Sequence, residues 1–175
     1  MKIASLMLAL AGALCLTGCS DLVSMEPFVT EKQSVADPNL AGTWKTNDKD
    51  LFIVEQNGSQ YTITYTSKEG STKFDALLLR VGDAEILDIV PSDSGILQIP
   101  VHAAVRVWPS GNELQWKFLD SKWLREQASS LLLSRPNEHG TLLLAPGEAV
   151  HNFLVKYAAD AKAYEGEVSV LTRVQ

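Results

Sequence analysis

The stretch that decides the fold is LFIVEQNGSQYTITYT, residues 51–66. Two runs of β-forming residues flank Asn57-Gly58, a pair that tolerates the positive φ angles of a tight turn. After the turn, Tyr61, Ile63 and Tyr65 alternate with threonines. A period of two is typical of a half-buried antiparallel strand. The stretch therefore predicts a β-hairpin with its aromatic face toward a core and its threonine face outward.

Runs of similar texture continue to the end of the chain, and short segments rich in Gly, Pro, Asp and Asn separate them. Because no long helical crossover connects the runs, we expect an antiparallel meander that closes into a barrel or packs as a sandwich. The fold class is therefore mainly β, and our choice is an up-and-down barrel of about eight to nine strands. After the first strand, which opens near residue 42, the predicted strands are 51–56, 61–66, 72–81, 84–90, 101–108, 113–119, 141–144 and 168–174.

Two short helices interrupt the later part of the chain. Asp120 or Ser121 can cap a helix that runs to about residue 130. A second helix begins around residues 146–148, where apolar residues repeat at helical spacing to about Ala159. The chain then ends on an alternating strand, and such a strand can remove the last open edge of a barrel.

The beginning of the chain has the features of a targeting signal. Lys2 precedes an apolar run that ends in Leu16-Thr17-Gly18-Cys19. A charged start, a short apolar segment and small residues at the cut are typical of an export signal. This stretch resembles the lipobox of bacterial lipoprotein precursors. The resemblance implies cleavage after residue 18 and a lipidated Cys19, whereas the alternatives are an ordinary secretory signal or a single helical anchor.

The same resemblance implies a location. Ser20 follows the cysteine, whereas the enterobacterial sorting rule favours Asp at that place for inner-membrane retention; here the Asp falls one place later, at Asp21. We therefore expect the protein at the outer membrane, on the periplasmic face. Its membrane partner is the N-terminal lipid, because two or three acyl chains, at about 0.8 kcal/mol per buried methylene, anchor a protein stably.

Residues 20–39 mix polar residues and two prolines with scattered apolar ones, and they show no sustained period. This texture predicts a flexible tether between the lipid and a barrel domain at 40–175. If extended at about 3.3 Å per residue, the tether would lift the domain tens of ångströms off the lipid. The alternative is a segment ordered against the domain, with Phe28 and Val29 docked.

Composition excludes some partners. Residues 19–175 contain 14 basic and 21 acidic residues, a formal net charge of −7. This charge argues against nucleic acid or an anionic lipid surface as the main partner. Cys15 lies in the signal and Cys19 would be a thioether, so no cysteine remains for a disulfide or a thiolate metal site. After the signal no apolar run approaches the roughly 20 residues of a spanning helix, so we expect a soluble domain held by its lipid.

Gly42-Thr43-Trp44 stands at the opening of the first predicted strand. It resembles the Gly-x-Trp start of lipocalins and related calycin barrels. The resemblance implies that Trp44 plugs one end of the barrel and that an arginine from a late strand covers it; Arg173 is the residue placed to do so. We expect its guanidinium within about 6 Å of the indole ring. The chain departs from the lipocalin pattern in lacking the Thr-Asp-Tyr turn.

Catalytic and metal sites find little support. His102, His139 and His151 are scattered, and Glu148 with His151 makes only an i, i+3 pair on one helix face. No nucleophile elbow, phosphate loop or cysteine pair occurs. We therefore predict no enzyme, no metal and no cofactor.

Acidic residues on the predicted strands are Asp75, Glu85 and Asp88, and Asp88 is the oddest because apolar residues flank it on both sides. We expect it to face outward beside water. If it faces inward it needs a partner, and Arg80 or Arg106 are the candidates.

Two functions remain. The first is a lipid-anchored binding module that holds a small apolar or amphipathic ligand inside a calycin-like barrel. The alternative is an accessory lipoprotein that docks an envelope protein complex and uses a solid barrel as scaffold.

Overall fold

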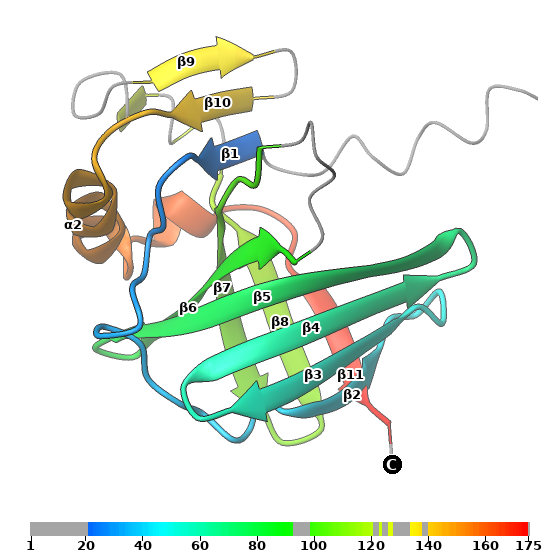
Figure 1. Ribbon diagram of the computed structural model, residues 1–175. Coiled ribbons are helices and arrows are strands. Elements are labelled where there is room, and N and C mark those ends of the chain that lie inside the picture. The colour runs from blue at the N-terminus through cyan, green and yellow to red at the C-terminus, as the bar shows by residue number, and fades with distance from the viewer. Residues whose placement is uncertain are drawn as a thin grey trace, which may run out of the picture.

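Eight antiparallel strands form a closed barrel in the computed structural model, which describes residues 21–92, 99–120, 123, 126–127, 134–137 and 140–174. The strand order is β11-β2-β3-β4-β5-β6-β7-β8, and pairing of β8 with β11 completes the wall (Figure 1). The predicted mainly β barrel is confirmed, and each predicted strand of the wall agrees within two residues. The bounds are β2 (Gly42–Lys45), β3 (Leu51–Asn57), β4 (Gln60–Ser67), β5 (Gly70–Val81), β6 (Ala84–Pro91), β7 (Ala103–Ser110), β8 (Glu113–Phe118) and β11 (Ser169–Arg173).

The β3–β4 hairpin has the two-residue loop Gly58-Ser59, with Asn57 opposite Gln60. Gly58 has φ 63° at the first loop position, as a type II′ turn requires. Tyr61 and Ile63 point into the barrel, and the threonine face lies on its outer side. The alternation read from the sequence is therefore confirmed.

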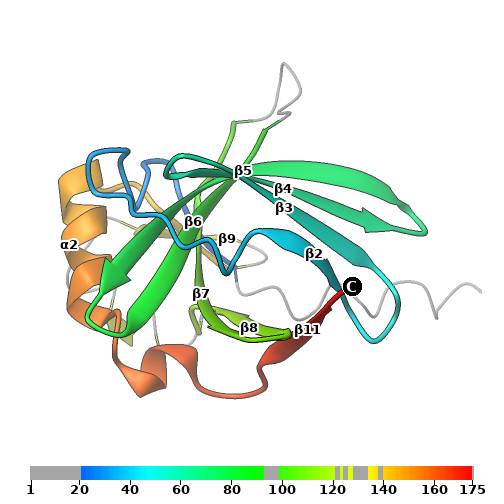
Figure 2. The same cartoon turned by 90° about the horizontal axis from the view of Figure 1, so that it is seen from below.

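Two hydrophobic cores share the barrel wall. Alternate residues of each strand face opposite sides, so Leu78 and Leu87 point inward while Leu79 and Ile86 point outward. On the outer side, α2 (Gly147–Tyr157) and the short helix η1 (Ala161–Tyr164) cover the wall (Figure 2). The buried residues of the inner core are Leu40, Trp44, Val54, Tyr61, Ala76, Leu78, Leu87, Val105, Val107, Leu114 and Leu171.

Helix α2 matches the second predicted helix, and it buries Val150, Phe153 and Leu154 on one stripe. Of the first predicted helix, most residues lie outside the described part of the chain; residues 123 and 126–127 are helical. Asp120 Oδ1 accepts a hydrogen bond from the Trp123 N–H at 2.7 Å, as a helix cap does. Within the described ranges, no helix is both long and apolar enough to cross a bilayer.

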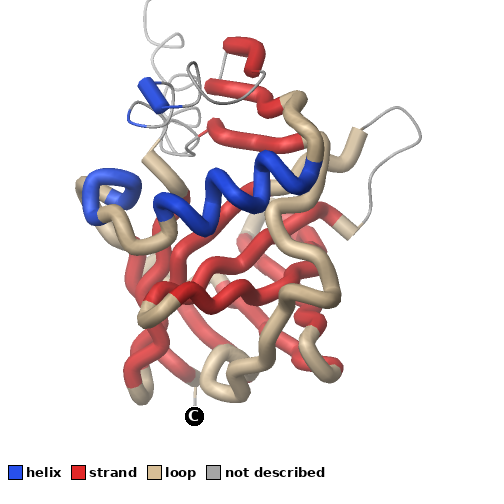
Figure 3. Tube along the Cα trace, turned by 90° about the vertical axis from the view of Figure 1, so that its left-hand side faces the viewer, coloured by secondary structure: helices blue, strands red, loops and turns tan. Residues whose placement is uncertain are grey.

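A second sheet lies beyond one end of the barrel, above α2 and away from the C-terminus (Figure 3). It contains β1 (Asp21–Ser24), β10 (Gly140–Leu143) and β9 (Ser134–Asn137), in the order β1-β10-β9. The pair β1–β10 is parallel, whereas β9 is antiparallel to β10 and is an edge strand, the position that tolerates its proline. The sequence predicted β10 but neither β1 nor β9.

Residues 25–40, here called the strap, run from β1 down the outside of the barrel (Figure 1). Phe28 is 0% exposed and Val29 1%, both in the outer core. Val35 makes an isolated bridge with Leu78 of β5. The flexible tether predicted for residues 20–39 is therefore wrong over the described residues 21–39, because Phe28 and Val29 are buried in the outer core and Val35 packs against the inner core.

Candidate functional site

One end of the barrel is closed by the residues that the Gly-x-Trp resemblance singles out. Arg173 lies opposite Trp44 in the β11–β2 pair, with its Cζ 4.1 Å from the centre of the indole ring. This distance is within the expected 6 Å or so for a cation over an aromatic face. Trp44 is 0% exposed, and its Nε1 donates to the Leu40 carbonyl at 2.9 Å.

The guanidinium of Arg173 is also tied to the backbone that enters β2. It donates to the Ala41 carbonyl at 2.8 Å and to the Asn39 carbonyl at 2.7 Å. Gly42 has φ 138°, and a Cβ there would overlap Arg173 Nη1. Only glycine combines this backbone angle with so close an approach. Gly42, Trp44 and Arg173 therefore form a structural closure in which the Trp44 indole N–H and both terminal nitrogens of Arg173 are bonded to backbone carbonyls.

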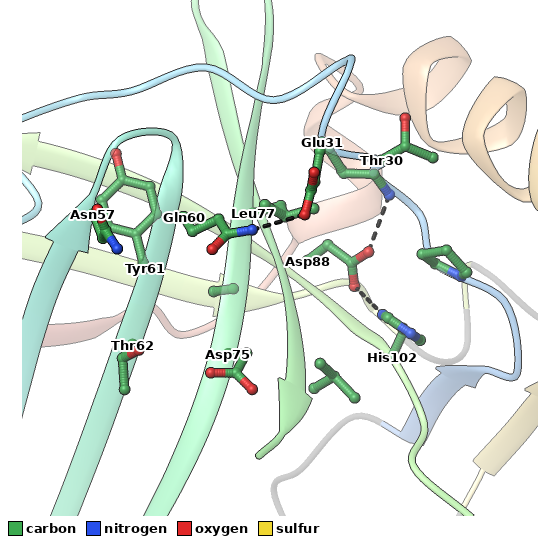
Figure 4. A pocket seen from close by; sticks show the side chains of 14 residues that line it. Thr30, Glu31, Asn57, Gln60, Tyr61, Thr62, Asp75, Leu77, Asp88 and His102 are labelled. Atoms are coloured by element: carbon green, nitrogen blue, oxygen red, sulfur yellow. Dashed lines mark hydrogen bonds and ion pairs between the residues drawn. The ribbon is translucent and has the colours of Figure 1, made fainter.

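A pocket of about 580 Å³ lies on the outer side of the barrel, between the strap and the outer face of β4, β5 and β6 (Figure 4). The sequence predicted a ligand inside the barrel; this cavity is on the other side of the wall. The residues that line it are Pro27, Val29, Thr30, Glu31, Asn57, Gln60, Tyr61, Thr62, Asp75, Ala76, Leu77, Asp88, Val90 and His102.

Asp88 is the polar centre of this pocket (Figure 4). It is 3% exposed, and its Oδ2 accepts a hydrogen bond from the Val29 N–H of the strap at 3.0 Å. Its Oδ1 lies 2.9 Å from Nδ1 of His102, just before β7. Because a carboxylate accepts, the imidazole donates through Nδ1. The carboxyl of Asp88 thus joins the strap to two neighbouring strands.

The expectation for Asp88 needs a correction. Its side chain does point out of the barrel, but the strap covers it, so it does not lie beside water. The arginines considered as partners lie elsewhere. Arg80 pairs with Glu85 across β5 and β6, and the Arg106 Cζ lies 4.9 Å and 5.0 Å from the centres of two aromatic rings, those of Trp108 and Tyr164.

The pocket combines negative charge with apolar walls. Glu31 and Asp75 add two further carboxylates, and no lysine or arginine is among the described residues that line the pocket. Glu31 Oε1 accepts a hydrogen bond from Gln60 Nε2 at 2.8 Å. Asp75 is exposed on β5 and makes no hydrogen bond or ion pair with other described residues. Its carboxylate is therefore available to a ligand, whereas both oxygens of Asp88 are already bonded.

Tyr61 lies on the barrel side of the pocket. Burial raises the pKa of its hydroxyl above the ordinary 10, so the group is protonated at neutral pH. The hydroxyl accepts from the Asp37 N–H at 2.6 Å and donates to the Asp37 carbonyl at 3.2 Å. Tyr61 therefore fixes the strap and has no free proton to offer a substrate.

The histidines are structural where the chain is described. Nδ1 of His151 on α2 donates to the Phe28 carbonyl at 2.8 Å and so holds the strap directly, whereas His102 bonds Asp88, the carboxylate that accepts from the strap. His139 and the predicted lipidation residue, Cys19, lie outside the described residues. In the described ranges, no three His, Cys, Asp or Glu side chains gather as a metal site would need.

The pocket was not predicted from the sequence. Two of its features were: the threonine face of β4 points outward, and Asp88 is unusual among its apolar neighbours. Glu31 could not be found, because that residue reaches the wall only through the fold of the strap.

Comparison with known proteins assigns no family. A scan against protein-family models finds no match, and searches of curated proteins and of solved structures find none.

Proposed function

We propose that this protein is a lipid-anchored binding protein of the bacterial outer membrane that faces the periplasm. Its ligand is a small amphipathic molecule with an amine, held in the pocket under the strap. The observation that carries the proposal is the lining: three carboxylates lie beside apolar side chains, and the described residues of the lining include no lysine or arginine. A volume of about 580 Å³ lies within the roughly 300–1,000 Å³ that small-molecule sites occupy.

The chemistry of the lining favours an amine over other groups. Asp75 is the carboxylate free to pair with an ammonium, and an ion pair at such an exposed position contributes about 0.2–1 kcal/mol. Leu77 and Val90 flank it with apolar surface, where each buried methylene of the ligand adds about 0.8 kcal/mol. An anionic ligand would meet like charges without a cation to offset them.

Replacing Asp75 by asparagine should weaken amine binding about two- to fivefold, because the ion pair at this exposed position is lost while the fold is kept. The probe is dansylcadaverine, a fluorescent amphipathic amine, and dansylamide is its neutral analogue. Titration by fluorescence gives both dissociation constants. We expect the wild type to prefer the amine and Asp75→Asn to lose that preference.

Asp83→Asn is the matched control, since it removes the same charge from the β5–β6 turn, outside the pocket. It should bind dansylcadaverine like the wild type. If both substitutions weakened amine binding equally, the effect would come from the net charge of the protein and not from the pocket. If the wild type did not prefer the amine, the assignment of ligand class would be refuted.

A second candidate is an apolar ligand at the end of the barrel interior. Four inward-facing aromatic residues there are only half-buried, and Nε1 of Trp116 is buried with no partner in the described part of the chain. If dansylamide binds and Asp75→Asn does not affect it, this interior site is favoured. If neither probe binds and crosslinking in cells captures one stoichiometric partner, the accessory role is favoured. The four aromatic residues are Phe52, Tyr65, Trp116 and Phe118.

The anchor is tested at Cys19. Cys19→Ala should abolish incorporation of a palmitate analogue and leave a larger precursor, because the thiol that receives the lipid is gone. Cys15→Ala, four residues earlier in the same signal, is the control and should be labelled normally. Density fractionation should place the wild type with the outer membrane. Label that persists on Cys19→Ala would exclude this lipidation site, and recovery only with the inner membrane would mean that Asp21 directs sorting.

A further inference from the structure

The folded part of the chain begins almost at the proposed lipid. Strand β1 starts at Asp21, and each of its residues is paired in parallel with β10, from Asp21 opposite Gly140 to Ser24 opposite Leu143. Only Ser20 separates β1 from Cys19. A tether of twenty residues is therefore replaced by a single residue.

This spacing limits how far the domain can stand from the bilayer. Consecutive Cα atoms are about 3.8 Å apart, so the two steps from Cys19 to Asp21 span at most about 7–8 Å. The headgroup layer of one leaflet is of similar depth, about 5–8 Å. The start of β1 must then lie at the level of the headgroups.

The pairing of the second sheet defines which end of the domain comes close. Asp21 lies opposite Gly140, and Gly140 lies opposite Asn137, so the end of the β9–β10 hairpin sits beside the start of β1. The β7–β8 turn and the C-terminus lie at the other end of the molecule (Figures 1 and 3).

We propose that the end of the second sheet formed by Asp21, Asn137 and Gly140 docks on a zwitterionic phospholipid surface, so that the domain rests on the membrane instead of hanging from it. The inference rests on the proposed lipidation of Cys19. Zwitterionic lipid is favoured because residues 19–175 carry a net charge of −7, which an anionic leaflet would repel at separations below a Debye length of about 8–10 Å.

The test is fluorescence energy transfer from a single label to the bilayer. With Cys19 occupied by lipid, the mature chain has no other cysteine, so Asn137→Cys and Asn112→Cys each give one labelling position. Acylated protein is reconstituted into phosphatidylcholine vesicles that contain an acceptor-labelled lipid. Transfer from position 137 should exceed that from position 112, in the β7–β8 turn, at least about twofold, because a domain of this length is about 40 Å across.

A flexible insertion of twenty Gly and Ser residues between Ser20 and Asp21 is the control, and it should make the two transfer efficiencies nearly equal. Circular dichroism checks that each labelled variant is folded, and if Asn137→Cys is not, Gly140→Cys takes its place. Equal transfer from the two positions in acylated protein without the insertion would overturn the docking and leave the anchor intact. An intact mass without acyl chains would overturn the anchor itself, and the docking with it.

Discussion

Replacing Trp44 with alanine should lower the free energy of unfolding by about 3–5 kcal/mol, the range for truncating a buried aromatic side chain. Trp44 is fully buried in the inner core, and its indole N–H holds the Leu40 carbonyl. Arg173→Ala should cost less, about 0.5–2 kcal/mol from the cation–π contact, together with the packing of its stem. Urea unfolding followed by circular dichroism measures both changes.

Ile53→Ala is a suitable control on the neighbouring strand, because Ile53 lies opposite Thr43 and is 39% exposed. Its substitution should cost well under half as much. In the double variant that combines Trp44→Ala with Arg173→Ala, the arginine substitution should lower the free energy of unfolding by less than it does in the wild-type background, since its ring partner is already absent. If Trp44→Ala cost no more than Ile53→Ala, the barrel end would not depend on the tryptophan.

Phe28→Ala should also lower the free energy of unfolding by about 3–5 kcal/mol, although the residue lies in a polar segment near the start of the domain. Its ring is 0% exposed in the outer core, and its carbonyl accepts the hydrogen bond from His151. Loss of the ring should also loosen the strap, and limited proteolysis should then cut within residues 25–40 before the barrel unfolds.

Val155→Ala on α2 is the control for Phe28, because Val155 is 37% exposed and its loss leaves no cavity. It should change the free energy of unfolding by less than about 1 kcal/mol and should not alter the pattern of proteolysis. If the strap were cleaved rapidly in the wild type and Phe28→Ala had little effect, the prediction of a flexible tether would be supported instead.

Most of the barrel could be predicted from the sequence because its strands and turns depend on residues that are close together in the chain. The loop at Gly58 and the alternation of Tyr61 and Ile63 each depend on residues within a few positions, and the structure agrees with both. The contact between Trp44 and Arg173 is distant in sequence, but a known barrel pattern suggested it.

The strap was mispredicted because its order comes from the surface that it covers. Phe28 and Val29 have polar and proline neighbours, and no period marks them. Their burial depends on an outer core that β6 and α2 supply. The hydrogen bond from the Val29 N–H to Asp88 was also missed, because a backbone group has no sequence pattern that would predict its partner.

The short strands β1 and β9 were missed because four residues are too few for a period to show, and neither has the apolar run that marked the equally short β10. The pocket was missed because its residues come from separate elements. Its carboxylates come from the strap, β5 and β6, so only the tertiary structure brings them into one site.

The seam of the barrel has a consequence for the order of events during folding. β2 closes on β11, and the hydrogen bond from Arg173 to Ala41 joins residues 132 positions apart. The wall is therefore incomplete until residues 169–173 have been synthesised. Closure of so long a loop carries a large entropic cost and is typical of barrels that fold in milliseconds to seconds. A nascent chain with this seam keeps its wall open until β11 has been made, so the closed barrel can form only after β2 through β8 are already present.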